Sequence, residues 1–384
     1  MVISKRDLRT IRMNEVDTLT QFCHELLATL PRSDQRRWGE IYVRGLVSLA
    51  GRKSIRRMAE TMAGWRAEQG LQQFVNQSTW SWGPIRQNLA RHLGQLYRPK
   101  AWAIGEAVFA KNGTSSVGVA RQFAPSAGRL LNCQLGLALF VVGDGEAVPV
   151  NWRLLLPQSW DHDADLRAKA HIPDSARHVQ RWQAVLSLVD ELAWGWELPP
   201  QPVVVDARHV MQTEQLLAGL EQRRMRYLVQ VPHESAAPLF GGEQGPRPGG
   251  VGRPVATMKW WDAANGRQRT SRYMIEAAPA RRGGEPAGLH RTRKLLTRWQ
   301  PEDSHPAQVW LTNMHAPMPE LIELSQAGAE TARETSRLYD DVGLDHFEGR
   351  SFRGWHHHVT LTSLAHAYLV SLRRAELGCD LRSC

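Results

Sequence analysis

The first hundred residues carry apolar positions at the spacing of helices. In residues 35–63, QRRWGEIYVRGLVSLAGRKSIRRMAETMA, apolar residues recur every three or four positions with basic residues between them. This spacing places the apolar side chains on one helix face. A break at Gly51, Arg52 and Lys53 separates two helical segments, which is typical of a helix-turn-helix with a basic turn. A helical bundle with a charged surface explains the pattern equally well, because no base-reading residue stands out.

From residue 100 the pattern changes to that of strands. The segments 101–109, 131–142 and 147–156 are rich in apolar and β-branched residues, and Gly143-Asp144-Gly145 between the last two is a strong hairpin signal. A helix is predicted over 175–194. The apolar run PVVVDARHV then stops at Asp206, as a central strand does when it presents a carboxylate at its carboxyl end. A helix over 213–224 and a strand over 226–231 follow.

The remaining chain divides by composition. Residues 232–310 are rich in Gly, Pro and basic residues, and we interpret them as a β-rich insertion with short strands over 255–262 and 271–278. Two long helical patterns close the sequence. We therefore expect an α/β fold with a mixed sheet, divided into an N-terminal helical region at 1–99, a core at 100–231, the insertion at 232–310 and closing helices at 311–384.

The charge balance predicts a polyanionic partner, and the N-terminal sequence predicts a cytoplasmic protein. The net charge is +10 and the pI is near 9.8, which favours nucleic acid before membrane as a partner; a solvated Arg-rich surface is the alternative. The four cysteines form no CxxC pair, which argues against a zinc ribbon or a disulfide scaffold. The charged N-terminus lacks the apolar core of a signal peptide, and no segment is long and apolar enough to span a membrane.

Several long segments carry a family resemblance. The stretches FAKNGTSSVGVARQF, LNCQLGLALF, PVNWRLLLPQSW and GLDHFEGRSFRGWHHHVTL occur in this order between about Arg36 and Leu369. They resemble insertion-sequence transposases of the DDE superfamily. The resemblance implies an RNase H-like core, a mixed sheet flanked by helices, behind an N-terminal helical region. It also implies DNA strand cleavage and transfer that depends on Mg²⁺.

The resemblance further implies where the catalytic carboxylates would lie. In this family the first strand typically ends in Asp-Asp-Thr, and the Asp beside Thr is catalytic. Those positions are Gly105, Glu106 and Ala107 here. The second carboxylate is Asp206, and the third position falls on Ala332.

The helix around the third position departs further from the family pattern. The Arg and Lys on either side of the third family acid fall on Gly328 and Tyr339. Glu330 and Glu334 lie two residues either side of Ala332, roughly 200° around a helix, so we expect them to face elsewhere.

The chemistry of the family makes these departures matter. Two divalent ions about 4 Å apart hold the attacking and leaving oxygens, and Mg²⁺ requires oxygen ligands at about 2.0–2.1 Å. Glu106 adds a methylene group, which moves its oxygens by more than the roughly 0.5 Å that a preorganised site tolerates. Ala332 offers no ligand. We expect Glu106 and Asp206 to be remnants of a catalytic site, with Mg²⁺ bound only if the family activity survives and no other cofactor.

The cations predicted to contact DNA lie in the basic turn, in the turn after the first strand and in the insertion. Phosphate contacts by such side chains give sequence-independent affinity, although Lys111 is equally interpreted as an ordinary turn lysine. The set is Arg52, Lys53, Arg56, Arg57, Lys111, Arg281, Arg282, Arg291, Arg293, Lys294 and Arg298.

Four interpretations remain open at this point, one of which is an inactive relic with no role. The first is a non-catalytic, DNA-binding accessory or regulatory protein that acts with an active transposase or as a homodimer. The second is non-nuclease chemistry on a small molecule in the former catalytic cleft, with Asp206, Glu106, His209, Tyr339 and tryptophans as lining. The least favoured is an active transposase with shifted metal ligands.

A polar cluster in the family-like motif also admits two interpretations. Asp345, His346, Glu348 and Arg350 form either a structural hydrogen-bond hub or, less favoured, a relocated active site. The consecutive histidines at 356–358 diverge by about 100° per residue on a helix, which is poor metal-ligand spacing.

Overall fold

A computed structural model describes residues 18–64, 67–210, 212–240, 256–262, 267–277, 293–300 and 306–380. Residues 18–26 are helical. The N-terminal helices that follow are α2 Ser33–Ser48, α3 Ile55–Met62, α4 Glu68–Asn76 and α5 Trp82–Leu96. Gly51 adopts the left-handed conformation in the turn between α2 and α3, and the Ser54 hydroxyl accepts a hydrogen bond from the Arg57 main-chain N–H at the start of α3.

The described strands form one ten-stranded mixed sheet. Its order is β2-β3-β1-β5-β6-β10-β9-β8-β7, and β4 pairs with β3. The strands are β1 Ala101–Ala110, β2 Ala120–Ala124, β3 Arg129–Gly143, β4 Glu146–Leu155, β5 Val203–Asp206, β6 Tyr227–Val231, β7 Ala256–Asp262, β8 Arg267–Ala277, β9 Lys294–Trp299 and β10 Gln308–Thr312.

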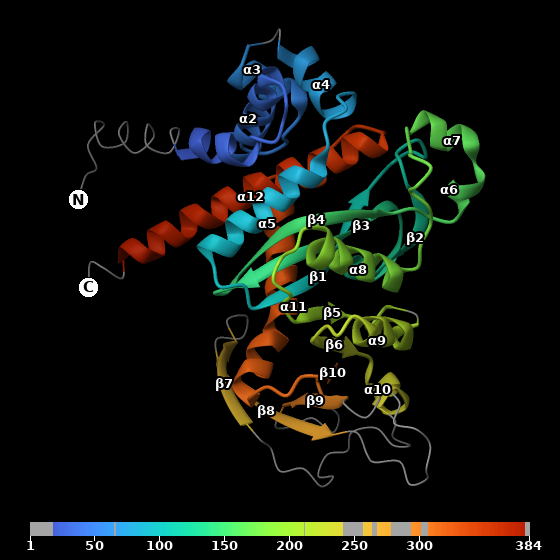
Figure 1. Cartoon of the computed structure of the whole chain (residues 1–384), viewed down its shortest axis with the longest axis vertical. Helices are drawn as coiled ribbons and strands as arrows, with labels where there is room; N and C mark the ends of the chain where they lie inside the picture. Colours follow the sequence, from blue (N-terminus) through green and yellow to red (C-terminus); the bar gives the residue numbers. More distant parts are fainter. Residues whose placement is uncertain are drawn as a thin grey trace.

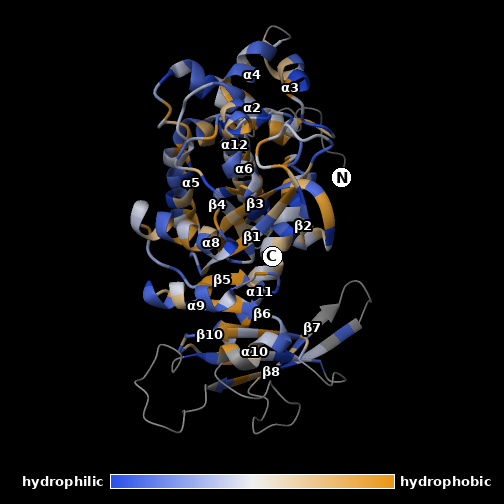
Figure 2. Cartoon of the chain, turned by 90° about the vertical axis from the view of Figure 1, so that its right-hand side faces the viewer, coloured by the Kyte–Doolittle hydropathy of each residue, from blue (hydrophilic) through white to orange (hydrophobic). Residues whose placement is uncertain are grey.

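The centre of this sheet has the predicted RNase H-like arrangement. β1 pairs antiparallel with β3 and parallel with β5, and β5 pairs parallel with β6. The central strands are buried and mostly apolar (Figure 2). The predicted fold class is therefore confirmed. β7, β8 and β9 lie within the sequence range expected for the insertion, and they extend the same sheet through β10.

The structure tests three local predictions about where elements begin, turn and end. Asp144 and Gly145 both have positive φ in the turn between β3 and β4, so the predicted hairpin is confirmed. β5 ends at Asp206, where the apolar run ends. The predicted start of the helix over 175–194 is wrong, because α8 begins at Arg181. The preceding segment is a loop, in which the His178 N–H donates a hydrogen bond to the Asp161 carboxylate.

Helices cover both faces of the central strands. The remaining helices are α6 Ser159–His162, α7 Ala164–Lys169, α8 Arg181–Asp190, α9 Thr213–Gln222, α10 His233–Phe240, α11 Met318–Asp340 and α12 Phe352–Asp380, and residues 191–195 continue α8 as a π-helical turn. α12 runs between α2–α4 and the sheet, and α5 lies beside it on β4 (Figure 1). α11 packs on β1, and α8 lies on the opposite face, where its Arg181 contacts Glu106.

The three consecutive histidines fix the N-terminal helices to α12. His356 lies beside the buried Arg86 guanidinium, whereas His357 stacks on Trp80 with ring centroids 3.6 Å apart. His358 shares a 2.9 Å hydrogen bond with the Tyr42 hydroxyl. Burial lowers the pKa of His357 and of His358 to about 4. These imidazoles are therefore neutral and pack between α12 and the N-terminal helical region.

Candidate active site

A cleft opens beyond the carboxyl end of β5. β5 stops at Asp206, whereas β1 continues to Ala110, so the second half of β1 pairs with β3 on one side and has no strand on the side of β5. The cleft has a volume of about 800 Å³. Its lining brings together the predicted positions Glu106, Asp206, His209, Gly328, Ala332 and Tyr339.

Glu106 projects from β1 towards the start of α8. Its side chain is 13% exposed, and it forms an ion pair with the guanidinium of Arg181, the first residue of α8. Burial raises the pKa of the Glu106 carboxyl above its usual range, and the charge and hydrogen bond of Arg181 offset part of this rise. The carboxylate is thus already partnered by a cation of the protein itself.

Asp206 is held in the same way by a residue two positions further along the chain. The Arg208 guanidinium donates from Nε to Oδ1 at 2.9 Å and from Nη2 to Oδ2 at 2.6 Å. The Arg208 main-chain N–H donates to Oδ1 at 3.1 Å, as in an Asx turn. Burial alone would raise the pKa of Asp206, but the hydrogen bonds and charge of Arg208 outweigh it, so the pKa lies below its ordinary value.

The two carboxylates leave the sheet on opposite faces. Val205 pairs with Ile104, so the next residue, Asp206, lies level with Gly105 rather than with Glu106. Side chains alternate between faces along a strand, and laterally paired residues share a face. Asp206 therefore shares the α11 face with Gly105, whereas Glu106 faces α8.

Gly105 occupies a place with no room for a side chain. A Cβ atom at this residue would lie 2.8 Å from Cε2 of Phe140 and 2.8 Å from Cγ2 of Thr331. These distances are too short for ordinary contacts, so an acidic side chain at position 105 would displace the packing between β1, β3 and α11.

Tyr339 closes the open edge of β1. Its hydroxyl accepts a hydrogen bond from the Val108 main-chain N–H at 2.7 Å and donates one to the Val108 carbonyl at 3.0 Å. A strand edge beyond the end of β5 would otherwise leave both groups unpaired. The position where the resemblance expects a lysine thus carries a group that completes the backbone hydrogen bonding. Burial raises the pKa of Tyr339, so the hydroxyl stays protonated at neutral pH.

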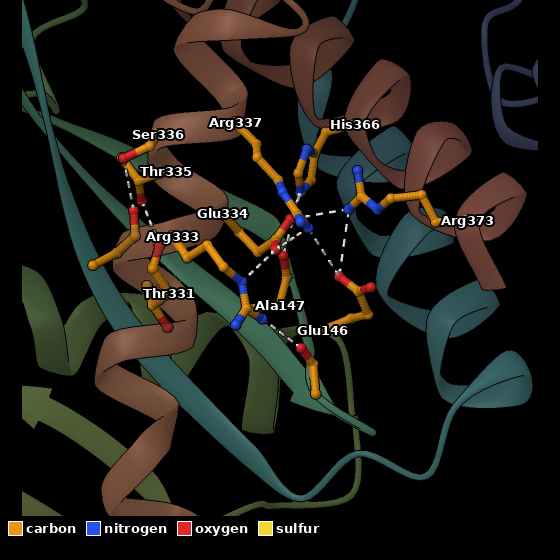
Figure 3. A network of polar contacts seen from close by, with 12 residues as sticks. Glu146, Ala147, Thr331, Arg333, Glu334, Thr335, Ser336, Arg337, His366 and Arg373 are labelled. Carbon is orange, nitrogen blue, oxygen red and sulfur yellow. Dashed lines mark hydrogen bonds and ion pairs between the residues drawn. The ribbon is translucent and has the colours of Figure 1, made fainter. Parts of the chain in front are cut away.

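The face of α11 away from the cleft buries Glu334. Figure 3 shows its carboxylate among arginine and histidine side chains from α11 and α12. The Arg337 guanidinium lies at 2.7 Å, Arg373 at 3.0 Å and the His366 ring at 3.3 Å. Burial disfavours the charged carboxylate, but these groups outweigh it and lower the pKa of Glu334. We call Glu146, Glu334, Arg337, His366 and Arg373 the Glu334 cluster; the cluster directs this acid away from Ala332 and the cleft.

Several of the cations predicted to contact DNA have buried partners. Lys53 and Lys111 donate to the main-chain carbonyls of Leu49 and Phe347. Arg293 is fully buried, where it pairs with Glu214 and Glu221. These three side chains are therefore engaged by groups of the protein itself.

The other predicted cations are placed at the surface or outside the described residues. Arg52, Arg56 and Arg57 are exposed near the α2–α3 turn, where Arg52 pairs with Glu348 and Arg56 with Glu60. On β9, Lys294 contacts the His315 ring at 3.0 Å, and Arg298 is half-buried. Arg281, Arg282 and Arg291 lie outside the described residues.

The polar cluster of the family-like motif lies away from the cleft. His346 and Glu348 line a separate cavity of about 260 Å³ beside α3 and α4. His346 Nδ1 accepts a hydrogen bond from the Lys53 main-chain N–H at 3.1 Å, and the Arg350 carbonyl accepts one from Val117. Asp345 is exposed beside His346. The structure therefore does not bring these residues together with Glu106 and Asp206.

The residues of the cleft do not fit a pair of Mg²⁺ ions. In the part of the chain that the structure describes, no three His, Cys, Asp or Glu side chains gather as metal ligands. Glu106 and Asp206 leave the sheet on opposite faces, each beside a guanidinium, and Ala332 supplies no oxygen at the third position.

Sequence reasoning missed both arginines of the cleft. Arg208 had a local signal, because an Asp at the end of a strand is typical of an Asx turn, and the arginine two residues later can bring its guanidinium to the same carboxylate. Arg181 had none, because 75 residues separate it from Glu106 and only the packing of α8 brings them together.

The comparison with known families agrees with the fold and the position of the cleft. The family model described as DDE superfamily endonuclease matches residues 25–293, so the chain belongs to this family. The match includes β1 and β5 with Glu106 and Asp206, and α11 with Ala332 follows it. No curated protein sequence matches the chain. Among the described helices, none is long and apolar enough to cross a membrane.

Proposed function

We propose that this protein derives from an insertion-sequence transposase and binds DNA in the former catalytic cleft without cutting it. The observation that carries the proposal is the pairing of both remaining acids with guanidinium groups of the chain, Glu106 with Arg181 and Asp206 with Arg208. The role that follows is that of a cytoplasmic accessory or regulatory protein, which acts with an active relative or as a homodimer.

The first part of the argument concerns the lost chemistry. Two-metal cleavage requires carboxylates that converge on both ions. Here Ala332 provides no carboxylate, and the space beside Gly105 is filled by Phe140 and Thr331. A divalent ion at Glu106 or Asp206 would also have to displace a guanidinium, which is bound to the carboxylate by charge-assisted hydrogen bonds.

The second part concerns the charge that remains. In an active enzyme of this family, metal ions neutralise the carboxylates before a phosphate approaches. Arg181 and Arg208 supply that neutralising charge from within the protein. A DNA phosphate therefore meets no net negative charge at these two pairs, and the basic surplus of the whole chain favours its approach.

The test separates binding from cleavage. We expect duplex DNA to bind in a gel shift at 50 mM NaCl, with the same affinity in EDTA as in Mg²⁺, and to lose affinity steeply as salt rises. A supercoiled plasmid incubated with Mg²⁺ or Mn²⁺ should stay uncut. Absence of binding at 50 mM NaCl would refute the DNA-binding role, and metal-dependent nicking that Asp206→Ala abolishes would refute the loss of cleavage.

An internal comparison tests the role of the arginines. Arg181→Ala and Arg208→Ala each leave a carboxylate uncompensated in the cleft, so each should weaken DNA binding in EDTA, and added Mg²⁺ should restore part of it. Arg32→Ala, which removes an exposed cation paired with Asp34 at the start of α2, is the control for loss of one positive charge elsewhere.

The small-molecule alternative is less well supported. Asp206, Glu106, His209 and Tyr339 do line one cavity, as that alternative expects. However, its lining residues include no tryptophan in the described chain, and the acids that would act on a substrate are engaged by Arg181 and Arg208.

A further inference from the structure

Two exposed apolar side chains lie next to each other at one edge of the sheet. Among the described residues four large apolar side chains are exposed, and two of them, Phe123 and Leu130, are direct cross-strand partners in the β2–β3 ladder. Phe123 is 44% exposed and Leu130 is 59% exposed. Single exposed apolar residues are common on protein surfaces, whereas adjacent ones mark contact sites.

This pair adjoins the cleft. Pro125, Ser126 and Ala127 follow β2 directly and line the cleft. The ring of Phe123 lies 6.0 Å from the ring of His209, another lining residue, at an interplanar angle of 63°. A ligand that leaves the cleft on this side therefore passes the Phe123 ring.

The surroundings of the pair are cationic. Arg121 is exposed two residues before Phe123 on the same face of β2, whereas Arg129, exposed at the start of β3, lies level with Ala124 on the other face. Residues 117–133 contain no Asp or Glu. A second copy of the chain docked here would bring these arginines together, whereas a polyanion would be attracted to them.

We propose that Phe123 stacks against an unpaired base of DNA as the strand leaves the cleft, that Leu130 packs beside the same base, and that Arg121 contacts an adjacent phosphate. This inference rests on the proposed DNA-binding function and adds the kind of DNA preferred: a single strand, or a duplex opened beside the bound site. An aromatic face stacks on any base, and cations along the same groove follow the backbone, so the contact is tolerant of sequence.

The experiment uses the full chain and a mixed-sequence single-stranded oligonucleotide. 2-Aminopurine replaces one base at a time, because its fluorescence depends on stacking. We expect the wild-type protein to change the fluorescence of one or two positions in EDTA. Phe123→Ala should remove this change and weaken single-strand affinity by about 5- to 150-fold, the range for loss of one base–aromatic stack. Leu130→Ala should have a smaller effect in the same direction.

Two further variants serve as controls. Phe123→Trp keeps an aromatic face and should retain both the fluorescence change and the affinity. Leu96→Ala removes a side chain of α5 that is 50% exposed, and it should leave both unchanged. Circular dichroism of each variant checks that the fold persists.

The outcomes distinguish this inference from the function on which it rests. If duplex DNA binds in EDTA but Phe123→Ala leaves single-strand affinity and fluorescence as in the wild type, the stacking contact is refuted and the proposed function stands. If Phe123→Ala instead dissociates a dimer without changing DNA affinity, the patch is a protein interface and the inference fails. If no DNA binds at all, the proposed function fails first.

Discussion

At the scale of single residues, positions that the family resemblance assigns to catalysis make structural contacts in the cleft. Tyr339 lies where the family resemblance expects a lysine, yet its hydroxyl completes the hydrogen bonding of Val108 on β1. Glu106 keeps a carboxylate, but its partner is now Arg181. Both side chains therefore link elements around the cleft, Tyr339 by hydrogen bonds and Glu106 by an ion pair.

The Tyr339 hydroxyl should be measurable in stability. Tyr339→Phe leaves the half-buried Val108 N–H and C=O without this partner, and loss of a hydrogen bond costs about 0.5–1.5 kcal/mol. Urea denaturation should show a loss of this size. Ser336→Ala removes a hydroxyl with one 3.3 Å contact on an exposed position of the same helix and should change stability by less than about 0.5 kcal/mol. Equal stabilities of the two variants would contradict the edge-capping role.

Glu334 should give the protein an acid-sensitive contribution to stability. Its pKa is depressed in the folded state, so it binds a proton more readily when unfolded. Its stabilisation is therefore complete above the ordinary carboxyl pKa of about 4.3 and is lost as pH falls through the lower, folded-state pKa. Glu334→Gln should destabilise the protein by about 3–5 kcal/mol at pH 7 and less at pH 3–4.

The measurement is a set of urea unfolding curves between pH 3 and pH 7. Glu60→Gln, which breaks an exposed pair with Arg56, is the control and should cost at most about 0.5 kcal/mol. A Glu334→Gln penalty that stays constant across this range would show that Glu334 contributes no charge-dependent stability.

At the scale of elements, the N-terminal helices depend on one buried arginine. Arg86 of α5 donates to Thr360 of α12 at 2.8 Å, and to Asn151 and the Trp152 carbonyl of β4 at 3.0 and 2.9 Å. Burial lowers its pKa to about 9, and Glu191 offsets part of this fall. One side chain therefore joins two helices and a strand through neutral acceptors.

Arg86→Lys should uncouple these elements. A lysine ammonium does not reproduce the planar guanidinium fork, so several buried acceptors would lose their donor. We expect a loss of about 3–5 kcal/mol, seen as a lower thermal midpoint, with faster hydrogen exchange in α5 than in the sheet. Arg91→Lys, which removes a single 3.4 Å contact to Trp196, should be nearly neutral. Uniform exchange changes in helix and sheet would contradict a local role.

Elements were predictable from the sequence to the extent that their signals were local. The Gly143–Gly145 turn and the end of β5 at Asp206 follow from turn residues and an apolar run, and both were predicted. The start of α8 was not, because tertiary contacts of His178 hold the preceding residues in a loop. The Arg181–Glu106 pair was out of reach for the same reason, since it depends on how α8 packs on β1.

At the scale of the whole molecule, the cleft departs from a two-metal site at several places rather than at one residue. The double variant Glu106→Asp, Ala332→Glu restores the family acids at two positions, yet Arg181, Arg208 and the filled space at Gly105 remain. We expect no plasmid nicking by this variant in Mg²⁺ or Mn²⁺. EDTA-sensitive nicking would mean that the two substitutions alone account for the missing activity.

The Glu334 cluster also limits how α11 can move. It holds one side of α11 against α12, while the Tyr339 hydroxyl holds the helix against β1. Because α11 is anchored in both directions, no modest rotation about its axis brings Glu330 or Glu334 round to the vacant ligand position. A carboxylate can therefore reach this position only through substitution at residue 332 or its neighbours, and not through a movement of the helix.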